Sequence, residues 1–222
     1  MAADSFAQGW LLFLVQLPSK PSSARVALWR RLRAIGATTM VNGAWVLPDT
    51  AAHAALFGKM RERVLRQGGT AFVLSIPASP PELAAAIVRH FRADRAREYD
   101  EFAERCTAFL DEIGKEAGAG KYTFAEMEEG EQDLEKLARW LKKIQARDFF
   151  PDERRQQSFA LMARCRDALE GFSHAVYVAE GVQETAADDS RPARRRTPPP
   201  AQRVGGPPST QEGTRGATGS PA

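Results

Sequence analysis

Residues 37–48 read ATTMVNGAWVLP, a pattern typical of a β-hairpin. Asn42-Gly43 is a strong hairpin signal, because a two-residue type I′ turn needs positive φ at both central positions. Pro48 ends the second run, since proline cannot donate to a sheet ladder. The stretch therefore predicts two antiparallel strands, at residues 38–41 and 44–47.

The segment before the hairpin predicts a strand and a helix. WLLFLVQL, residues 10–17, is a continuous apolar run whose length suits a strand buried on both faces. The PSS sequence that soon follows offers an N-cap for a helix, and Gly36 ends that helix as a C′ glycine would. Within the helix four apolar residues share one face, which predicts that all four are buried: Leu28, Trp29, Leu32 and Ile35.

The segment after the hairpin predicts the same pair of elements again. Asp49 or Thr50 can cap a helix over residues 51–67, and TAFVLSI, residues 70–76, predicts a last strand. The order strand, helix, strand, strand, helix, strand is that of a ferredoxin-like βαββαβ unit. We therefore expect an α+β protein whose first domain, residues 8–77, is an antiparallel sheet with two helices on one face.

Residues 80–181 have a different periodicity, which predicts a second domain. Apolar residues recur at alternating spacings of three and four over three segments, and the first begins at Pro80 and carries Tyr99, Phe102, Cys106, Phe109 and Ile113. A glycine-rich loop is expected at residues 114–122, and further helices at about 124–147 and 152–179. The pattern predicts an antiparallel three-helix bundle with coiled-coil seams, in which both cysteines, Cys106 and Cys165, are buried.

Residues 183–222 contain almost no large apolar side chain and are rich in Pro, Gly, Ser, Thr and Ala. Such a segment cannot bury enough surface to fold, so we expect a disordered tail. The tail includes the basic, proline-rich sequence RPARRRTPPP, at residues 191–200.

Charge is unevenly distributed along the chain. The formal charge is +6 over residues 1–76, −5 over residues 77–182 and +2 over residues 183–222, which agrees with the net charge of +3. A basic front indicates that a polyanionic partner would meet this part of the chain. The alternative is that these cations only solvate helix surfaces.

Several other classes of protein are not indicated. No apolar run approaches the roughly 18 residues that can span a bilayer, and we find no secretory signal, so we expect a cytoplasmic protein without membrane contact. The three histidines and two cysteines show no metal spacing, and no catalytic motif is present. We expect no metal, no cofactor and no enzymatic activity.

Three stretches carry a resemblance to a known family. WLLFLVQLPSKPSSARVALWRRLRAIGATTMVNGAWVLP, HFRADRAREYDEF and DLEKLARWLKKIQARDFF resemble, in this order, the N-terminal region of the chromate-resistance regulator family ChrB. The resemblance covers roughly residues 8–181. Full-length members look like two-part proteins whose C-terminal domain is associated with the chromate response. This chain has only the tail after residue 181, so whether chromate contacts it is left open.

The resemblance implies a regulatory protein that binds DNA through basic residues. The matching positions in this sequence are Lys20, Arg25, Arg30, Arg31 and Arg33. Such side chains would contact phosphates, which position a protein on DNA without identifying bases. Trp29 and Trp45 could stack on bases, but Trp29 shares the apolar stripe and is therefore expected in the core. The alternative function is a protein-interaction module, for a separate chromate-responsive protein or in a homodimer, with no DNA binding of its own.

The block Arg147-Asp148-Phe149-Phe150 is expected to be a structural motif that ends the second bundle helix. Its two phenylalanines would wedge into the core at the turn. Asp148 can pair with Arg147 or another helix, or can cap the next helix. The alternative is a pocket for a ligand or partner at this end of the bundle.

Overall fold

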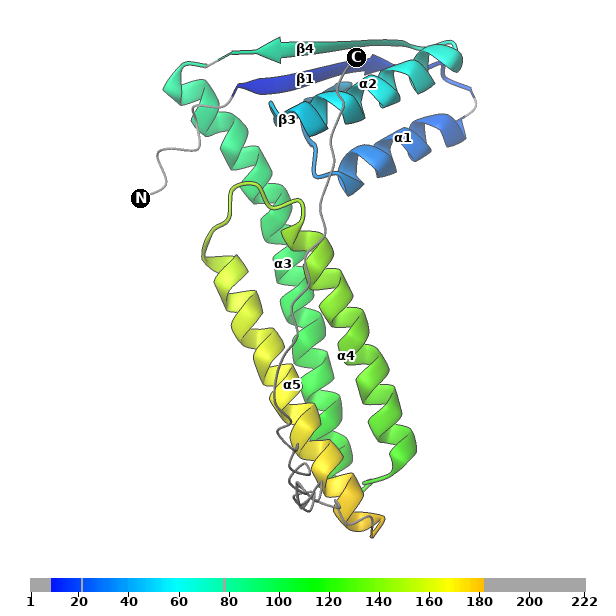
Figure 1. Cartoon of the computed structure of the whole chain (residues 1–222), viewed down its shortest axis with the longest axis vertical. Helices are drawn as coiled ribbons and strands as arrows, with labels where there is room; N and C mark the ends of the chain where they lie inside the picture. Colours follow the sequence, from blue (N-terminus) through cyan, green and yellow to red (C-terminus); the bar gives the residue numbers. More distant parts are fainter. Residues whose placement is uncertain (1–8, 21, 78, 182–222) are drawn as a thin grey trace, which may run out of the picture. The chain divides into compact units, whose positions relative to one another are not determined.

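The structure is a computed structural model, and it describes residues 9–20, 22–77 and 79–181. The tail predicted at residues 183–222 lies outside the described residues. The described part belongs to one compact unit, which contains both the sheet and the helical bundle (Figure 1).

Four strands form one antiparallel sheet in the order β2-β3-β1-β4. The strands are β1 (Trp10–Gln16), β2 (Thr38–Val41), β3 (Ala44–Pro48) and β4 (Thr70–Ile76). This order, with a helix after β1 and another after β3, is the predicted ferredoxin-like topology. The expected α+β fold is confirmed.

The predicted hairpin joins β2 and β3. Gly43 has a φ of +81°, and a Cβ at this position would stand 2.8 Å from the carbonyl oxygen of Val15. Glycine is therefore required both for the turn and for the close approach of β1. The register shifts between Thr39 and Val41, so the short edge strand β2 is irregular near the turn.

Two helices, α1 (Ser22–Ala34) and α2 (Ala51–Arg66), cover one face of the sheet (Figure 1). Phe13 of β1 and Phe57 of α2 are both fully buried, and their ring centroids lie 5.1 Å apart. Thr50 caps α2 by accepting a hydrogen bond from the backbone N–H of His53. The cap satisfies one of the amides that the first helical turn leaves without a partner.

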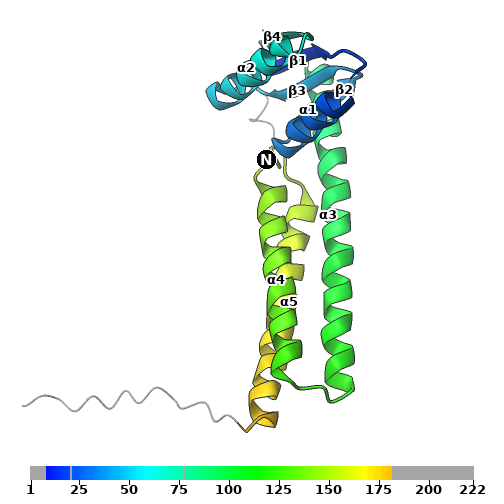
Figure 2. The same ribbon diagram turned by 90° about the vertical axis from the view of Figure 1, so that its right-hand side faces the viewer.

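Three long helices form the bundle: α3 (Pro81–Gly118), α4 (Phe124–Gln145) and α5 (Glu153–Ala179) (Figures 1 and 2). Thr123 and Asp152 cap α4 and α5. The glycine-rich loop was predicted too long, because α3 continues as a helix through Gly118 and only residues 119–123 connect it to α4. Gly114 and Gly118 have open space around them and are tolerated within the exposed last turns of α3.

The described residues contain two hydrophobic cores, and α3 contributes to both. Its first three turns place Ile87, Val88 and Phe91 in the core of the sheet unit. From Tyr99 onward its apolar residues belong to the bundle core, together with both cysteines. The division between the two cores thus falls within α3.

Candidate nucleic-acid interface

The cations expected to contact DNA lie in and beside α1. Lys20, Arg25, Arg30 and Arg31 are exposed, and none has a carboxylate within ion-pair distance among the described residues. Residues 9–48 contain no Asp or Glu at all. Four exposed cations therefore lie in and beside α1, none of them in an ion pair among the described residues.

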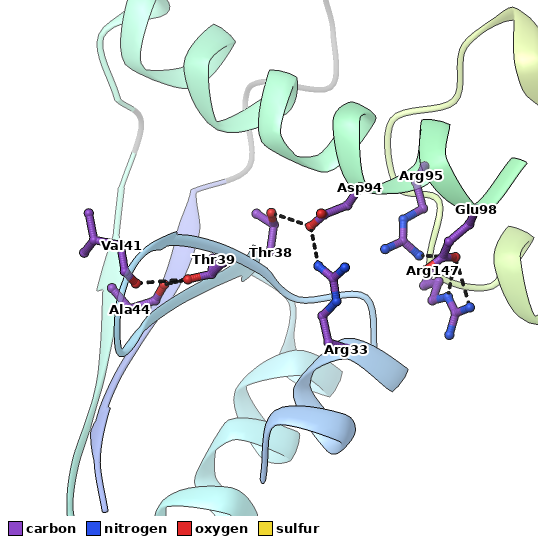
Figure 3. A network of polar contacts seen from close by, with 9 residues as sticks. All are labelled: Arg33, Thr38, Thr39, Val41, Ala44, Asp94, Arg95, Glu98 and Arg147. Carbon is purple, nitrogen blue, oxygen red and sulfur yellow. Dashed lines mark hydrogen bonds and ion pairs between the residues drawn. The ribbon is translucent and has the colours of Figure 1, made fainter. Parts of the chain in front are cut away.

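Arg33 is placed differently from the other four, and Figure 3 shows its guanidinium beside Asp94. Its Nη1 lies 2.9 Å from Oδ2 of Asp94 on α3, and the Thr38 hydroxyl donates to the same oxygen at 2.8 Å. Asp94 and Thr38 are buried. Because this ion pair joins α1 to α3, the Arg33 guanidinium is already held within the protein.

Sequence analysis missed three further cations, which α2 brings to the same surface. A groove of about 280 Å³ lies between α1 and α2, and Arg31 lines it together with Lys59, Arg63 and Arg66. No carboxylate lines this groove, although Arg66 also has Glu62 at 4.0 Å in an exposed pair. The i, i+4, i+7 spacing of the three residues on α2 was the available signal, since it places them on one helix face.

The prediction that Trp29 is buried is wrong. Leu32 is fully buried and Leu28 and Ile35 are partly buried, but Trp29 is 53% exposed. Successive residues on a helix differ by about 100°, so the stripe formed by the three aliphatic residues already faces the sheet and Trp29 lies at its margin. The Arg33 guanidinium lies over the indole, 5.8 Å from the ring centroid.

A second groove, of about 390 Å³, lies beside Trp29, between α1 and the sheet. Its lining is apolar except for Arg25, and it includes Val26 and Trp29 of α1 and Trp45 of β3. Trp45 is buried, whereas Val26 and Trp29 are among the exposed large hydrophobic residues. An exposed apolar strip thus borders the basic surface.

The junction of the sheet unit and the bundle holds a cluster of ion pairs (Figure 3). Glu98 Oε2 accepts from Arg95 Nη1 at 2.9 Å, and it lies 3.0 Å from both Nε and Nη2 of Arg147. Arg95 is 4% exposed, and its Nε has no hydrogen-bond partner among the described residues. Burial lowers the pKa of Arg95, and Glu98 opposes that shift.

The block of residues 147–150 packs at this junction. Asp148 accepts a hydrogen bond from the Tyr99 hydroxyl at 2.8 Å, and Asp152, not Asp148, caps α5. Burial raises the pKa of Asp148 and also raises the pKa of Tyr99. Phe149 and Phe150 pack with the sheet core, and Phe150 lies 5.8 Å from Trp10 and 5.3 Å from Phe91, between ring centroids.

Both cysteines are fully buried, as predicted. The Cys165 thiol donates to the carbonyl oxygen of Cys106 at 3.7 Å. A hydrogen bond with Cys165 and burial raise the pKa of Cys106. A protonated, inaccessible thiol is a poor nucleophile and metal ligand, and no group of His, Cys, Asp and Glu with metal-binding geometry occurs among the described residues.

Within the part of the chain that the structure describes, none of the helices has the length and apolar character that crossing a membrane requires.

Comparison with known proteins confirms the resemblance seen in the sequence. The model of a family described as "Protein ChrB, N-terminal" matches residues 25–183. Protein ChrB of Cupriavidus metallidurans is 29% identical to this chain over 146 residues, which cover 65% of this chain and 41% of that protein. The chain therefore spans less than half the length of this curated relative. No solved structure matches the chain.

Proposed function

Because the chain belongs to the ChrB family, whose N-terminal region it matches, we propose that it is a regulatory protein linked to chromate resistance. In this proposal the chain is a binding protein rather than an enzyme, and its partner is DNA. The surface formed by α1 and α2 binds the DNA backbone.

The basic surface carries this proposal. Arg25, Arg30 and Arg31 are exposed on α1, and Lys59 and Arg63 extend the surface across the groove to α2. Such cations release condensed counterions when they contact phosphates, and this release supplies most of the affinity for DNA in sequence-independent binding. Arg33 has a different role, because Asp94 holds its guanidinium.

The test is fluorescence anisotropy of the full chain on labelled duplex DNA over a series of salt concentrations. Neutralising Arg25, Arg30 and Arg31 to Gln should lower the slope of log K against log salt by about 2.7, which is about 0.9 for each lost phosphate contact. A slope that stays the same, or duplex binding that is absent at low salt, would contradict the proposal.

A matched control removes the same charge from the bundle. Arg139, Arg164 and Arg166 are exposed on α4 and α5, so changing all three to Gln lowers the net charge equally. This variant should keep the slope of the wild-type protein. If both triple variants lose affinity alike, net charge alone accounts for binding and the surface on α1 and α2 is not the site.

A groove in the bundle favours a second candidate function, a protein-interaction module. The groove lies between α3 and α4, has a volume of about 850 Å³ and has an acidic lining that includes Glu112, Glu116, Glu126 and Glu129. Burial, a hydrogen bond with Glu126 and repulsion by the charge of Glu126 together raise the pKa of Glu116. A basic segment of a partner protein would relieve this repulsion.

The two functions respond to opposite substitutions. Changing Glu112, Glu126 and Glu129 to Gln should abolish binding of a partner and leave DNA binding intact. Pull-down of the separately expressed C-terminal half of Protein ChrB from Cupriavidus metallidurans, with this variant and with the Arg25, Arg30 and Arg31 variant, measures the first effect. Capture that survives the loss of the three carboxylates would exclude the acidic groove as the interface.

A further inference from the structure

The groove beside Trp29 has a feature that phosphate binding does not use. Trp29 is a large aromatic side chain, half exposed, in the middle of a helix whose neighbouring side chains are cationic. Of the tryptophans in the chain, Trp10 and Trp45 are buried and Trp140 is half-buried. Trp29 thus offers an open indole beside an apolar groove.

One face of the indole lies beneath the guanidinium of an ion pair between α1 and α3. Asp94 is buried on α3 and binds the Arg33 guanidinium at 2.9 Å, and that guanidinium lies over the Trp29 ring. Arg33 is therefore a positioning residue, because it joins the ring to a fixed carboxylate. A flat ring with restricted motion loses little entropy when a planar ligand stacks on it.

The surroundings of the groove select the ligand by charge and by shape. Arg25 lines the groove, and Arg30 and Arg31 follow Trp29 on α1, while no carboxylate lies between residues 9 and 48. Apolar walls next to cations suit a ligand with a flat apolar part and an adjacent anionic part. The volume of about 390 Å³ falls in the range of small-ligand sites, about 300–1,000 Å³.

We propose that this groove takes an unpaired base of DNA, which stacks on Trp29 while Arg25 and Arg30 contact the flanking phosphates. The proposal rests on the proposed DNA binding and specifies its substrate, a single-stranded or locally opened segment. A base within a duplex has both faces covered by its neighbours, and extracting it costs unstacking and unpairing energy. Aromatic side chains in basic grooves are the usual stacking platforms for single strands.

The experiment measures binding of the full chain to three labelled DNAs of equal length at one salt concentration: oligo-dT, a mixed-sequence duplex and an abasic strand. Trp29→Ala should weaken binding to oligo-dT by about 5-fold to 150-fold, the loss expected for one stacked base. It should leave duplex binding nearly unchanged. The wild-type protein should bind the abasic strand as weakly as the variant binds oligo-dT, because that strand has the phosphates and no bases.

Phe159→Ala is the matched control, because Phe159 is another exposed aromatic residue, on α5, far along the chain from the basic surface. It should change none of the three affinities. Trp29→Phe keeps an aromatic ring and should restore part of the affinity for oligo-dT, which separates loss of stacking from loss of folding. In the wild-type protein oligo-dT should also quench tryptophan fluorescence, and Trp29→Phe should remove that quenching.

Two results distinguish this proposal from the proposed function. Duplex binding that depends on Arg25, Arg30 and Arg31, with oligo-dT binding unaffected by Trp29→Ala, would refute the base site and leave backbone binding standing. Absence of binding to every DNA at low salt would refute both.

Discussion

We expect the carboxylate of Glu98 to contribute far more to the free energy of unfolding than the carboxylate of an exposed ion pair with similar distances. Replacing it by Gln keeps the size of the side chain and removes its charge. Arg95 and Arg147 then lose the negative charge that they share, which sits on an oxygen 2.9 Å and 3.0 Å from their guanidinium nitrogens. The Arg95 side chain is only 5% exposed, so water cannot replace the lost carboxylate there.

The expected magnitude follows from burial. Removing one partner of a buried ion pair costs about 3–5 kcal/mol, because the other charge stays buried without compensation. Water reaches part of this cluster, since the side chain of Glu98 is 22% exposed. We therefore expect the lower end of that range, about 3 kcal/mol, for Glu98→Gln.

The matched control is Asp133→Asn, which breaks a pair with Lys136 whose 2.7 Å separation is even shorter. Both of those side chains are at least half exposed, so the expected loss is about 0–1 kcal/mol. Urea unfolding followed by circular dichroism measures both variants, and the midpoint should shift with an unchanged m-value.

A loss below about 1 kcal/mol for Glu98→Gln, equal to that of the surface control, would refute the reasoning, because it would mean that Arg95 finds other solvation. A second substitution checks the cause. Arg95→Met in the Glu98→Gln background should recover much of the loss, since it removes the buried charge that lacks a partner.

Three further predictions follow from the same packing. Gly36→Ala should lower the melting temperature more than Gly68→Ala: both glycines have positive φ, but only at Gly36 would a Cβ stand 2.5 Å from the Cβ of Arg147. Equal decreases in melting temperature for the two variants would contradict this expectation, because they would mean that Arg147 moves aside for the added Cβ. Asp148→Asn should remove a pH dependence of stability. Burial raises the pKa of Asp148 above its ordinary value of 3.8, so the native state binds the proton more tightly than the unfolded chain. The carboxyl group then favours folding in acid, and this contribution is lost as the pH rises through the folded pKa. The free energy of unfolding of the wild type minus that of the variant should therefore fall with rising pH, and a flat difference in urea titrations would contradict the assignment. The two buried cysteines should react with a thiol reagent only after unfolding, and rapid labelling of the native protein would contradict their placement.

Local signals in the sequence predicted most of the fold. Asn42-Gly43 specifies a turn whatever surrounds it, because positive φ is a property of those two residues. Pro48 and Gly36 end their elements for equally local reasons. The end of α3 was misplaced because two glycines in an exposed helix end cost too little to stop it.

The candidate site was predicted less completely. Sequence reasoning identified the arginines of α1 but treated them alike, although Arg33 is held by Asp94 and the others are exposed. It also left out Lys59 and Arg63, because only the packing of α2 beside α1 joins them to Arg31. Their DNA contacts stay a prediction that the binding experiments test.

Residue types and short-range spacing are enough to predict the elements, their order and the basic front of the chain. Tertiary structure decided which side chains of that front remain available. Asp94 is 61 positions from Arg33 in the sequence, and only the passage of α3 across β2 brings them together. Trp29 is exposed because three aliphatic neighbours already fill the face of α1 that meets the sheet. Burial depends on the area that distant elements offer, and no local pattern contains that quantity.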